Sequence, residues 1–467
     1  MMKYYLAIDI GASSGRHILG WVDNGKMMLE EIYRFNNDIE EKNGHLCWNY
    51  DRLFESIVAG IKECGRLGKI PYTIGIDTWA VDFVLLDKNN RPIGDTVAYR
   101  DSRTNGMDKI LEQHISEKEL YSRTGIQKQM FNSVYQLLAI KQSNPEQLDE
   151  AESFLMVPEY FNFLLTGVKK NEYTNATTTA LVNASTKRWD NFVTDALGLP
   201  KKLFSSELYM PCEIVGELTE QIQKEVGFNS RVILPATHDT GSAFLAVPAR
   251  DENAVYISSG TWSLLGVEIL QPITTEQSRQ ANFTNEGGYT YRYRYLKNIM
   301  GLWMIQSVRR ELDKKYSFAE LEEMARKSEY FSSVVNVNDA VFLAPKSMIN
   351  AVKDYCAATR QKAPETIGEI MQCIYISLAS SYKDSISELE RLTSKSFTSI
   401  NIVGGGSKDG YLNSLTAKAT GLPVFAGPTE GTALGNLIAQ FIAAGEYKNL
   451  EAARAAIKNS FEIKQYR

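Results

Sequence analysis

Small and hydroxyl-bearing residues near the start of the chain form a turn that could bind a phosphate. The segment Gly11-Ala-Ser-Ser-Gly15 lies between the β-rich runs 5–10 and 18–22. Its closely spaced backbone N–H groups and two hydroxyls let a phosphate approach closely. Asp9 precedes this turn, and a carboxylate there would repel a phosphate unless a hard cation such as Mg²⁺ lay between them. An ordinary glycine-rich hairpin would show the same residues.

The segment His238-Asp-Thr240 could carry acid–base chemistry. It follows the strand-like run 231–234 and leads into a small-residue helix start, Thr240-Gly-Ser-Ala243. Backbone N–H groups at a helix start favour an anion and would hold Asp239 ionised. An ionised carboxylate can accept the proton of a reacting hydroxyl. The alternatives are that Asp239 only caps the helix and that His238 is a core histidine.

The composition is that of a globular protein with more than one domain. The chain has 467 residues, 44% of them hydrophobic and 23% charged, which is too long for a single core. Its net charge of −5 argues against a nucleic-acid partner. The apolar run at the start breaks too early for a signal peptide, and no uncharged apolar run is long enough to span a bilayer. We therefore expect a cytoplasmic protein without nucleic-acid or membrane partners.

The cysteines and histidines offer little material for metal or redox chemistry. The five cysteines form no Cys-x-x-Cys pattern, so free thiols are expected, with a Cys356–Cys373 pair as the alternative. Of the four histidines, only His238 stands beside other reactive residue types. The sequence therefore gives no basis for zinc-dependent hydrolysis.

Strand-like and helix-like patterns alternate along the chain, which predicts an α/β fold. Residues 48–65 have helical spacing, 72–87 indicate two strands around a polar break, and 108–170 are largely helical in pattern. The threonine-rich run 172–180 favours an irregular segment. Residues 297–312 are predicted to form an amphipathic helix.

Two stretches about half a chain apart share one layout. Residues 254–266 repeat the strand, small-residue turn and strand of the first hairpin. Residues 399–410 form another strand that runs into a glycine turn, followed by a helix at 412–420. This predicts an internal duplication of fold, though not of sequence. We place the boundary near residue 247, which gives domains 1–246 and 247–467.

Nine short motifs, in order along nearly the whole chain, together resemble the FGGY family of carbohydrate kinases. They are Asp-Ile-Gly-Ala-Ser-Ser-Gly-Arg (9–16), Asp-Thr-Trp-x-Val-Asp (77–82), Tyr-Arg-Asp-Ser-Arg-Thr (99–104), Glu-Tyr-Thr-Asn-Ala-Thr-Thr-Thr (172–179), His-Asp-Thr (238–240), Ser-Ser-Gly-Thr-Trp-Ser (258–263), Arg-Tyr-Leu-Lys-Asn-Ile-Met-Gly-Leu-Trp (294–303), Val-Gly-Gly-Gly (403–406) and Gly-Pro-Thr-Glu-Gly-Thr-Ala-Leu-Gly-Asn (427–436). Ala80 stands where members acting on L-rhamnulose usually carry glycine, and Gly241 stands where alanine is common.

The resemblance implies an α/β fold of two actin-like (ribonuclease H-like) ATPase domains, with ATP and sugar in the cleft between them. It implies ATP- and Mg²⁺-dependent phosphorylation of a ketose, L-rhamnulose, at O1, by a monomer or homodimer. One alternative is a kinase for L-fuculose, L-ribulose or D-xylulose, whose members usually carry a Lys and a Trp that are absent here near 131–136. Another is a non-catalytic actin-like ATP-binding regulator, which would not need Asp239.

The resemblance also assigns roles to single residues. Asp239 would be the catalytic base, and Asp9 would orient Mg²⁺ through water. Sugar contacts would come from Ala80, His238, Asp239, Thr240 and Asn298. The nucleotide would be held by Ala12, Ser13, Ser14, Gly15, Arg16, Thr261, Gln306, Gly404 and Gly405. Within the predicted helix at 297–312, Asn298 and Gln306 would lie roughly 12 Å apart along the axis.

Overall fold

The computed structural model describes residues 2–467, and the chain divides into two compact units. The first unit comprises Met1–Ala246, Glu268–Tyr295 and Thr432–Ser460, within the described residues. The second comprises Val247–Val267, Leu296–Gly431 and Phe461–Arg467. Each unit is therefore assembled from separate stretches of the chain.

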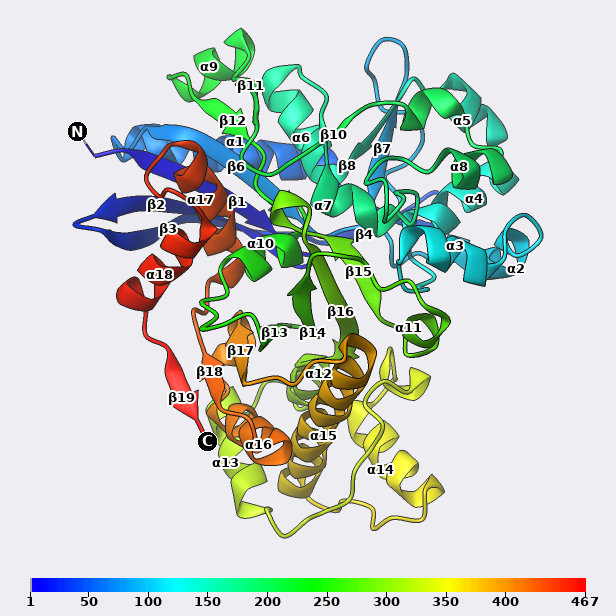
Figure 1. Cartoon of the computed structure of the whole chain (residues 1–467), viewed down its shortest axis with the longest axis vertical. Coiled ribbons are helices and arrows are strands. Elements are labelled where there is room, and N and C mark those ends of the chain that lie inside the picture. The colour runs from blue at the N-terminus through cyan, green and yellow to red at the C-terminus, as the bar shows by residue number, and fades with distance from the viewer. Residues whose placement is uncertain (1) are drawn as a thin grey trace. The chain divides into compact units, whose positions relative to one another are not determined.

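The first unit is built on a mixed sheet in the order β11-β12-β6-β1-β2-β3 (Figure 1). Strand β1 is antiparallel to β2, which is antiparallel to β3, whereas β1, β6 and β12 run parallel. The strands are β1 (Tyr4–Ile10), β2 (Ser14–Asp23), β3 (Lys26–Asn36), β6 (Pro71–Thr78), β11 (Ile214–Glu217) and β12 (Arg231–Ile233). The predicted first hairpin is confirmed, with its turn reduced to residues 11–13.

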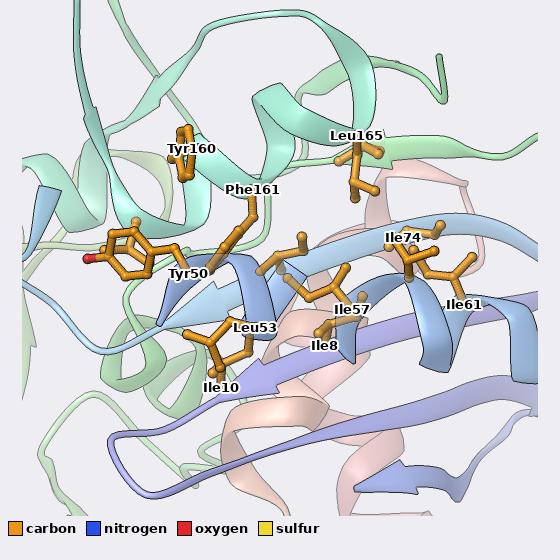
Figure 2. Packing of buried hydrophobic residues seen from close by; sticks show 14 of the residues in the cluster. Ile8, Ile10, Tyr50, Leu53, Ile57, Ile61, Ile74, Tyr160, Phe161 and Leu165 are labelled. Atoms are coloured by element: carbon orange, nitrogen blue, oxygen red, sulfur yellow. The ribbon is translucent and has the colours of Figure 1, made fainter. Parts of the chain in front are cut away.

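The core of this unit forms where α1 (Tyr50–Arg66) packs on the sheet, and Figure 2 shows its apolar stripe. Leu53, Ile57 and Ile61 recur every fourth residue and are almost fully buried, as the predicted helical spacing requires. Burying each such side chain stabilises the fold by about 1.5–3 kcal/mol. The cluster continues through Phe161 of α6 (Val157–Thr166).

The predicted helical region is confirmed, apart from one strand. It contains α2 (Met107–Leu111), α3 (Glu117–Thr124), α4 (Ser133–Ser143), α5 (Pro145–Glu150) and α6. The strand β8 (Ser153–Met156) was not predicted and pairs with β7 (Phe83–Leu86). Four buried or half-buried residues are too few to show a period that separates a strand from a helix.

The threonine-rich run is regular, so the prediction of an irregular segment is wrong. It forms β9 (Asn171–Glu172), α7 (Tyr173–Ala176) and the 3₁₀ turn η2 (Thr177–Thr179). The hydroxyls of Thr177, Thr178 and Thr179 each donate to the carbonyl three residues earlier. These bonds satisfy the hydroxyls locally and let a polar run be buried as helical turns.

The second unit contains the strand order β14-β13-β17-β18-β19 (Figure 1). Strand β13 is antiparallel to β14 and parallel to β17, which is parallel to β18. The strands are β13 (Ala254–Ser259), β14 (Trp262–Ile269), β17 (Ser399–Val403), β18 (Val424–Ala426) and β19 (Lys464–Tyr466). The series β14-β13-β17-β18 repeats the pairing of β2-β1-β6-β12, so the predicted duplication of fold is confirmed.

Helices α12 (Trp303–Glu311), α13 (Phe318–Lys327), α14 (Met348–Ala358), α15 (Ile367–Thr393) and α16 (Gly410–Thr420) belong to the same unit. Cys356 of α14 and Cys373 of α15 lie with their sulfurs 3.9 Å apart, and all five cysteines are free thiols, as predicted. None of the helices in the described part of the chain is long and apolar enough to span a membrane.

The predicted helix at 297–312 is wrong in its first half. Residues up to Met300 belong to the strand β16 (Tyr293–Met300), and α12 begins at Trp303. Gly301 lies between the two elements. Close packing requires glycine at this position, because a Cβ there would lie 2.6 Å from the backbone carbonyl carbon of Trp262. Asn298 and Gln306 therefore lie on a strand and a helix, and the expected 12 Å helical separation does not apply.

Shorter elements complete the fold. They are β4 (Ile39–Lys42), β5 (His45–Trp48), α8 (Asn191–Ala196), β10 (Leu208–Tyr209), α9 (Glu220–Val226), α10 (Asp239–Leu245), α11 (Glu276–Gln280), β15 (Thr284–Gly287), α17 (Gly431–Ala443) and α18 (Leu450–Ser460).

Candidate active site

Three carboxylates gather where parallel strands of the first unit end. Asp9 of β1 and Asp77 of β6 are register partners, and Asp239 follows β12 as the first residue of α10. The Thr78 N–H donates to the Thr237 carbonyl at 2.9 Å, which fixes the segment before Asp239 beside the end of β6. In open α/β sheets, ligands bind outside the carboxyl ends of the strands. This edge is therefore the candidate site of the first unit.

Asp9 is buried and ion-paired within the first hairpin. The Nε and a terminal nitrogen of Arg16 donate to its Oδ2 at 3.1 and 2.9 Å. The predicted phosphate residues Ser14, Gly15 and Arg16 are part of β2, whereas Ala12 and Ser13 lie in the turn. A Cβ at Gly15 would lie 2.1 Å from the Phe35 ring, so packing alone requires glycine there.

Asp77 was not assigned a role from the sequence, although it opens the Asp-Thr-Trp motif. It is fully buried, and its Oδ2 accepts a 2.6 Å hydrogen bond from the Asn436 amide. Its Oδ1 is buried without a hydrogen-bond partner among residues 2–467. Burial, and then the charge of Asp9, raise the pKa of Asp77 well above its usual range. An orphaned carboxylate oxygen beside Asp9 fits a hard cation.

Asp239 is held by one of its two oxygens. Its Oδ1 accepts from the Thr240 N–H at 2.5 Å and from the Thr240 hydroxyl at 3.1 Å, and lies 3.3 Å from Nε2 of His238. No hydrogen bond to Oδ2 exists within the described chain. The N-cap residue of α10 is His238, and Asp239 is the first helical residue, whose carboxylate accepts from a backbone N–H of the first turn.

The pKa of Asp239 is shifted in the direction opposite to the one that the helix start alone would give. Burial raises the pKa of Asp239, and the charge of Asp9 adds to the rise. His238 and the hydrogen bonds from Thr240 lower this pKa but do not outweigh burial. The expected helix-start effect exists, but it is not the dominant one. A raised pKa makes the carboxylate a better proton acceptor.

A buried ion pair between Arg294 and Glu286 lies behind His238. Arg294 begins one of the nine motifs but was assigned no role, and Glu286 belongs to none of them. Arg294 is 1% exposed, and one of its terminal nitrogens lies 3.1 Å from Nδ1 of His238. The other lies 3.0 Å from Oε2 of Glu286. Burial would raise the pKa of Glu286, but the Arg294 guanidinium outweighs it and leaves that pKa lowered. His238 is thus a polar core residue with defined partners on both sides.

A second pair of buried carboxyl groups supports the same turn. The Thr237 hydroxyl donates to Oε1 of Glu159 at 2.6 Å and to Oε2 of Glu172 at 3.0 Å. The Thr237 N–H also donates to Glu172 at 3.1 Å. Burial raises the pKa of Glu159 to about 8. These bonds anchor the residue that immediately precedes His238.

Ala80 lies half-buried in the loop that follows β6. Its neighbour Val81 has a φ of 69°, a left-handed conformation that is strained for a β-branched residue. The Val81 carbonyl accepts from the Ser133 hydroxyl and, at 3.2 Å, from the Gln136 amide. The surrounding side chains thus hold this loop in one conformation, as is common where a site must be rigid.

The candidate residues of the second unit form two groups. Thr261 is exposed in the β13–β14 turn, where its carbonyl and that of Gly260 accept from the N–H groups of Trp303 and Leu302 at 3.2 and 3.0 Å. Gln306 is half-buried on α12. Asn298 of β16 has a buried Oδ1 without a hydrogen-bond partner among the described residues, which leaves it free to accept from a ligand.

The glycine turn after β17 forms the other group. Gly404 has a φ of 85°, and a Cβ there would lie 2.9 Å from the Ser259 carbonyl oxygen. At Gly405, by contrast, a Cβ would meet no atom within 4 Å. Packing and backbone conformation explain Gly404, but they do not explain Gly405. Open space above a glycine is what close approach of a nucleotide requires.

Comparison with models of protein families shows to which family the chain belongs. The N-terminal domain of the FGGY family of carbohydrate kinases matches residues 4–246, and its C-terminal domain matches residues 255–444. The chain belongs to the FGGY family of carbohydrate kinases. The fold and kinase activity implied by the sequence motifs are thereby confirmed at the level of the family.

Curated relatives match along the whole chain. A rhamnulokinase of Halalkalibacterium halodurans is 53% identical over 100% of this chain and 99% of its own. Rhamnulokinases of Oceanobacillus iheyensis and Bacillus subtilis are 50% and 42% identical, covering 100% and 99% of this chain and 98% and 95% of theirs.

Solved structures share the fold at low identity. Gluconate kinase from Lactobacillus acidophilus matches with a TM-score of 0.81 and 17% identity, covering 100% of this chain and 94% of its own. Plasmodium falciparum glycerol kinase with ADP matches with a TM-score of 0.80 and 15% identity over the same shares. The predicted two-domain α/β fold is therefore confirmed as that of the FGGY kinases.

Proposed function

We propose that this chain transfers the terminal phosphoryl group of ATP to O1 of L-rhamnulose. The observation that carries the proposal is identity of 42–53% to proteins named rhamnulokinase along the full chain. The carboxylate site of the first unit supports it, because phosphoryl transfer needs a group that accepts the hydroxyl proton and groups that neutralise phosphate charge. We place the sugar and phosphate-loop functions in domain 1–246 and nucleotide binding in domain 247–467.

Asp239 acts as the base in this proposal. Thr240 and His238 contact its Oδ1, so Oδ2 is the oxygen left to accept the proton of the sugar hydroxyl. Ala80, His238, Thr240 and Asn298 contact the sugar. The rise in the pKa of Asp239 on burial increases its affinity for that proton.

The remaining predicted residues bind the nucleotide and its cation in this proposal. Asp9 and the orphaned oxygen of Asp77 would hold Mg²⁺, partly through water, because in residues 2–467 no group of three or more His, Cys, Asp or Glu could hold a metal directly. When bound, Mg²⁺ supplies neutralisation of phosphate charge. ATP is held by Ala12, Ser13, Ser14, Gly15, Arg16, Thr261, Gln306, Gly404 and Gly405. A cytoplasmic location and a monomer or homodimer complete the proposal.

The test is turnover of a ketose panel with Mg-ATP. L-Rhamnulose, L-fuculose, L-ribulose and D-xylulose are each supplied, ADP release is followed, and ³¹P–¹³C coupling identifies the phosphorylated carbon. We expect the highest kcat/KM for L-rhamnulose, with the ester at C1. A higher kcat/KM for another ketose would assign a different sugar. ATP binding without turnover of any ketose would favour the non-catalytic regulator.

A further inference from the structure

We propose that Arg294 is a positioning residue that fixes the tautomer of His238 and, through His238, the orientation of the Asp239 carboxylate. The inference rests on the proposed function only in giving Asp239 the role of base. Four side chains carry it, Glu286, Arg294, His238 and Asp239, and all belong to the first unit.

The first step concerns the two terminal nitrogens of Arg294. A guanidinium group has five N–H donors and no acceptor. Its 3.1 Å contact with Nδ1 of His238 has hydrogen-bond geometry, so Nδ1 must offer a lone pair. Neutral imidazole then carries its proton on Nε2.

The second step follows that proton. Nε2 lies 3.3 Å from Oδ1 of Asp239, the oxygen that Thr240 also contacts. With the proton on Nε2, the positive end of that N–H bond faces Oδ1 and attracts it, so the carboxylate is held by Thr240 and by the charge contact with His238. Oδ2 is then the free acceptor. With the proton on Nδ1, the Nε2 lone pair would face a carboxylate oxygen and repel it.

Glu286 offers the competing arrangement. Its Oε2 lies 3.3 Å from Nδ1 of His238, so a proton on Nδ1 could be donated to it instead. Neither that contact nor the 3.0 Å contact between Oε2 and Arg294 has hydrogen-bond geometry, whereas the contact between Arg294 and Nδ1 of His238 does. We infer that Glu286 neutralises Arg294, while Arg294 makes the bond that selects the tautomer.

The placement of Arg294 argues for this role over simple packing. A buried charge is costly unless it is paired and hydrogen-bonded. The Nε of Arg294 donates to the Gly287 carbonyl at 2.8 Å, which orients the guanidinium plane, and Glu286 balances its charge at 3.0 Å. The plane directs its second terminal nitrogen at the histidine. In metal sites, partners that fix a histidine in this way typically change activity about 10–100-fold when they are replaced.

The test reads the tautomer directly. Full-length protein with ¹⁵N-labelled histidine is examined by two-bond ¹H–¹⁵N correlation spectra, and the His238 signals are assigned from their loss in His238→Gln. We expect Nε2 protonated and Nδ1 unprotonated in the wild type near neutral pH. A proton on Nδ1, alone or together with Nε2, would overturn the proposal whatever the enzyme's activity.

Two variants separate the roles of Arg294 and Glu286. In Arg294→Met, Glu286 is left as the partner of Nδ1, so we expect the proton to move to Nδ1 and kcat to fall about 10–100-fold, with ATP KM unchanged. In Glu286→Gln, Arg294 still donates, so the tautomer should persist. A persistent tautomer in Arg294→Met, or a moved proton in Glu286→Gln, would contradict the assignment.

The matched control is Arg454→Met, which breaks another Arg–Glu pair of the first unit. Arg454 lies 3.0 Å from Glu268 and donates to the Phe244 carbonyl. It should lower the melting temperature without moving the proton of His238. If Arg294→Met does not fold, the wild-type spectrum still decides, and a failure there leaves the phosphoryl-transfer assignment intact.

Discussion

The two units repeat one strand order but carry different groups at the ends of matching strands. In the first unit, β1, β6 and the segment after β12 carry Asp9, Asp77 and Asp239. In the second, the corresponding β13 ends in Ser259, and Gly404 and Gly427 follow β17 and β18. The carboxylates are the groups that we propose for the cation and the proton. In the second unit the open space is at Gly405, next to Gly404, where a Cβ would meet no atom within 4 Å.

This difference separates what the fold decides from what the side chains decide. The parallel strands bring their carboxyl ends to one edge in both units, so functional groups gather there in each. Residue type then divides the work, with proton transfer assigned to the first unit and close nucleotide approach to the second. The predictions below test that division.

The largest effect is expected from removing the base. Asp239→Asn keeps an oxygen that accepts from Thr240 but removes the charge and the proton acceptor. We expect kcat for L-rhamnulose at saturating Mg-ATP to fall about 10²–10⁴-fold, with an unchanged melting temperature as the folding control. A folded variant within tenfold of wild type would remove Asp239 from the chemistry.

Glu159 should make stability depend on pH through the first unit. Its pKa rises from 4.5 to about 8 on folding, so between these values the native state holds a proton that the unfolded state lacks. Stability present below pH 4.5 is therefore lost as pH rises towards 8, by up to about 1.4 kcal/mol per pH unit.

Glu159→Gln mimics the protonated form and should flatten this dependence. Urea unfolding at pH 5, 6, 7 and 8 compares it with wild type, and Glu150→Gln, at an exposed position on α5, serves as the control. Equal slopes in wild type and Glu159→Gln would show that this carboxyl group does not titrate as its burial implies.

Much of the fold could be predicted from local sequence, and the site only in part. The hairpins, the helix with Leu53, Ile57 and Ile61, and the duplication all leave short-range patterns. The prediction of one helix over residues 297–312 was wrong because the apolar residues of a strand and of a helix, on either side of Gly301, together mimic a helical period. Arg294 reaches His238 only through folding, since the two are 56 residues apart, and no local spacing encodes that contact.

A substitution in the glycine turn of the second unit should change nucleotide binding and leave the other steps unaffected. Gly405→Val places its Cβ where no protein atom lies within 4 Å, so the fold should tolerate it. If a nucleotide approaches there, steric overlap costs about 1–3 kcal/mol, which raises ATP KM about 10–100-fold and leaves kcat at saturation nearly unchanged. An unchanged ATP KM, measured with a melting curve alongside, would take Gly405 out of the nucleotide site.

The smallest effect concerns sugar choice. Ala80→Gly removes one methyl group from a loop that Ser133 and Gln136 hold rigid. A methyl group at a contact changes discrimination about tenfold or somewhat more, so kcat/KM should be re-ranked among the four ketoses while ATP KM stays constant. The same ranking in both proteins would mean that Ala80 does not face the sugar.

The division of work between the two units is tested most directly by nucleotide affinity in Asp239→Asn. Mg-ADP is titrated calorimetrically into wild type and into the folded variant, without sugar. Because nucleotide recognition is assigned to the glycine and hydroxyl groups, we predict a Kd within about threefold of wild type, a difference under 1 kcal/mol, despite the lost turnover. A Kd weakened tenfold or more would contradict the account, since the carboxylate would then be part of the nucleotide site.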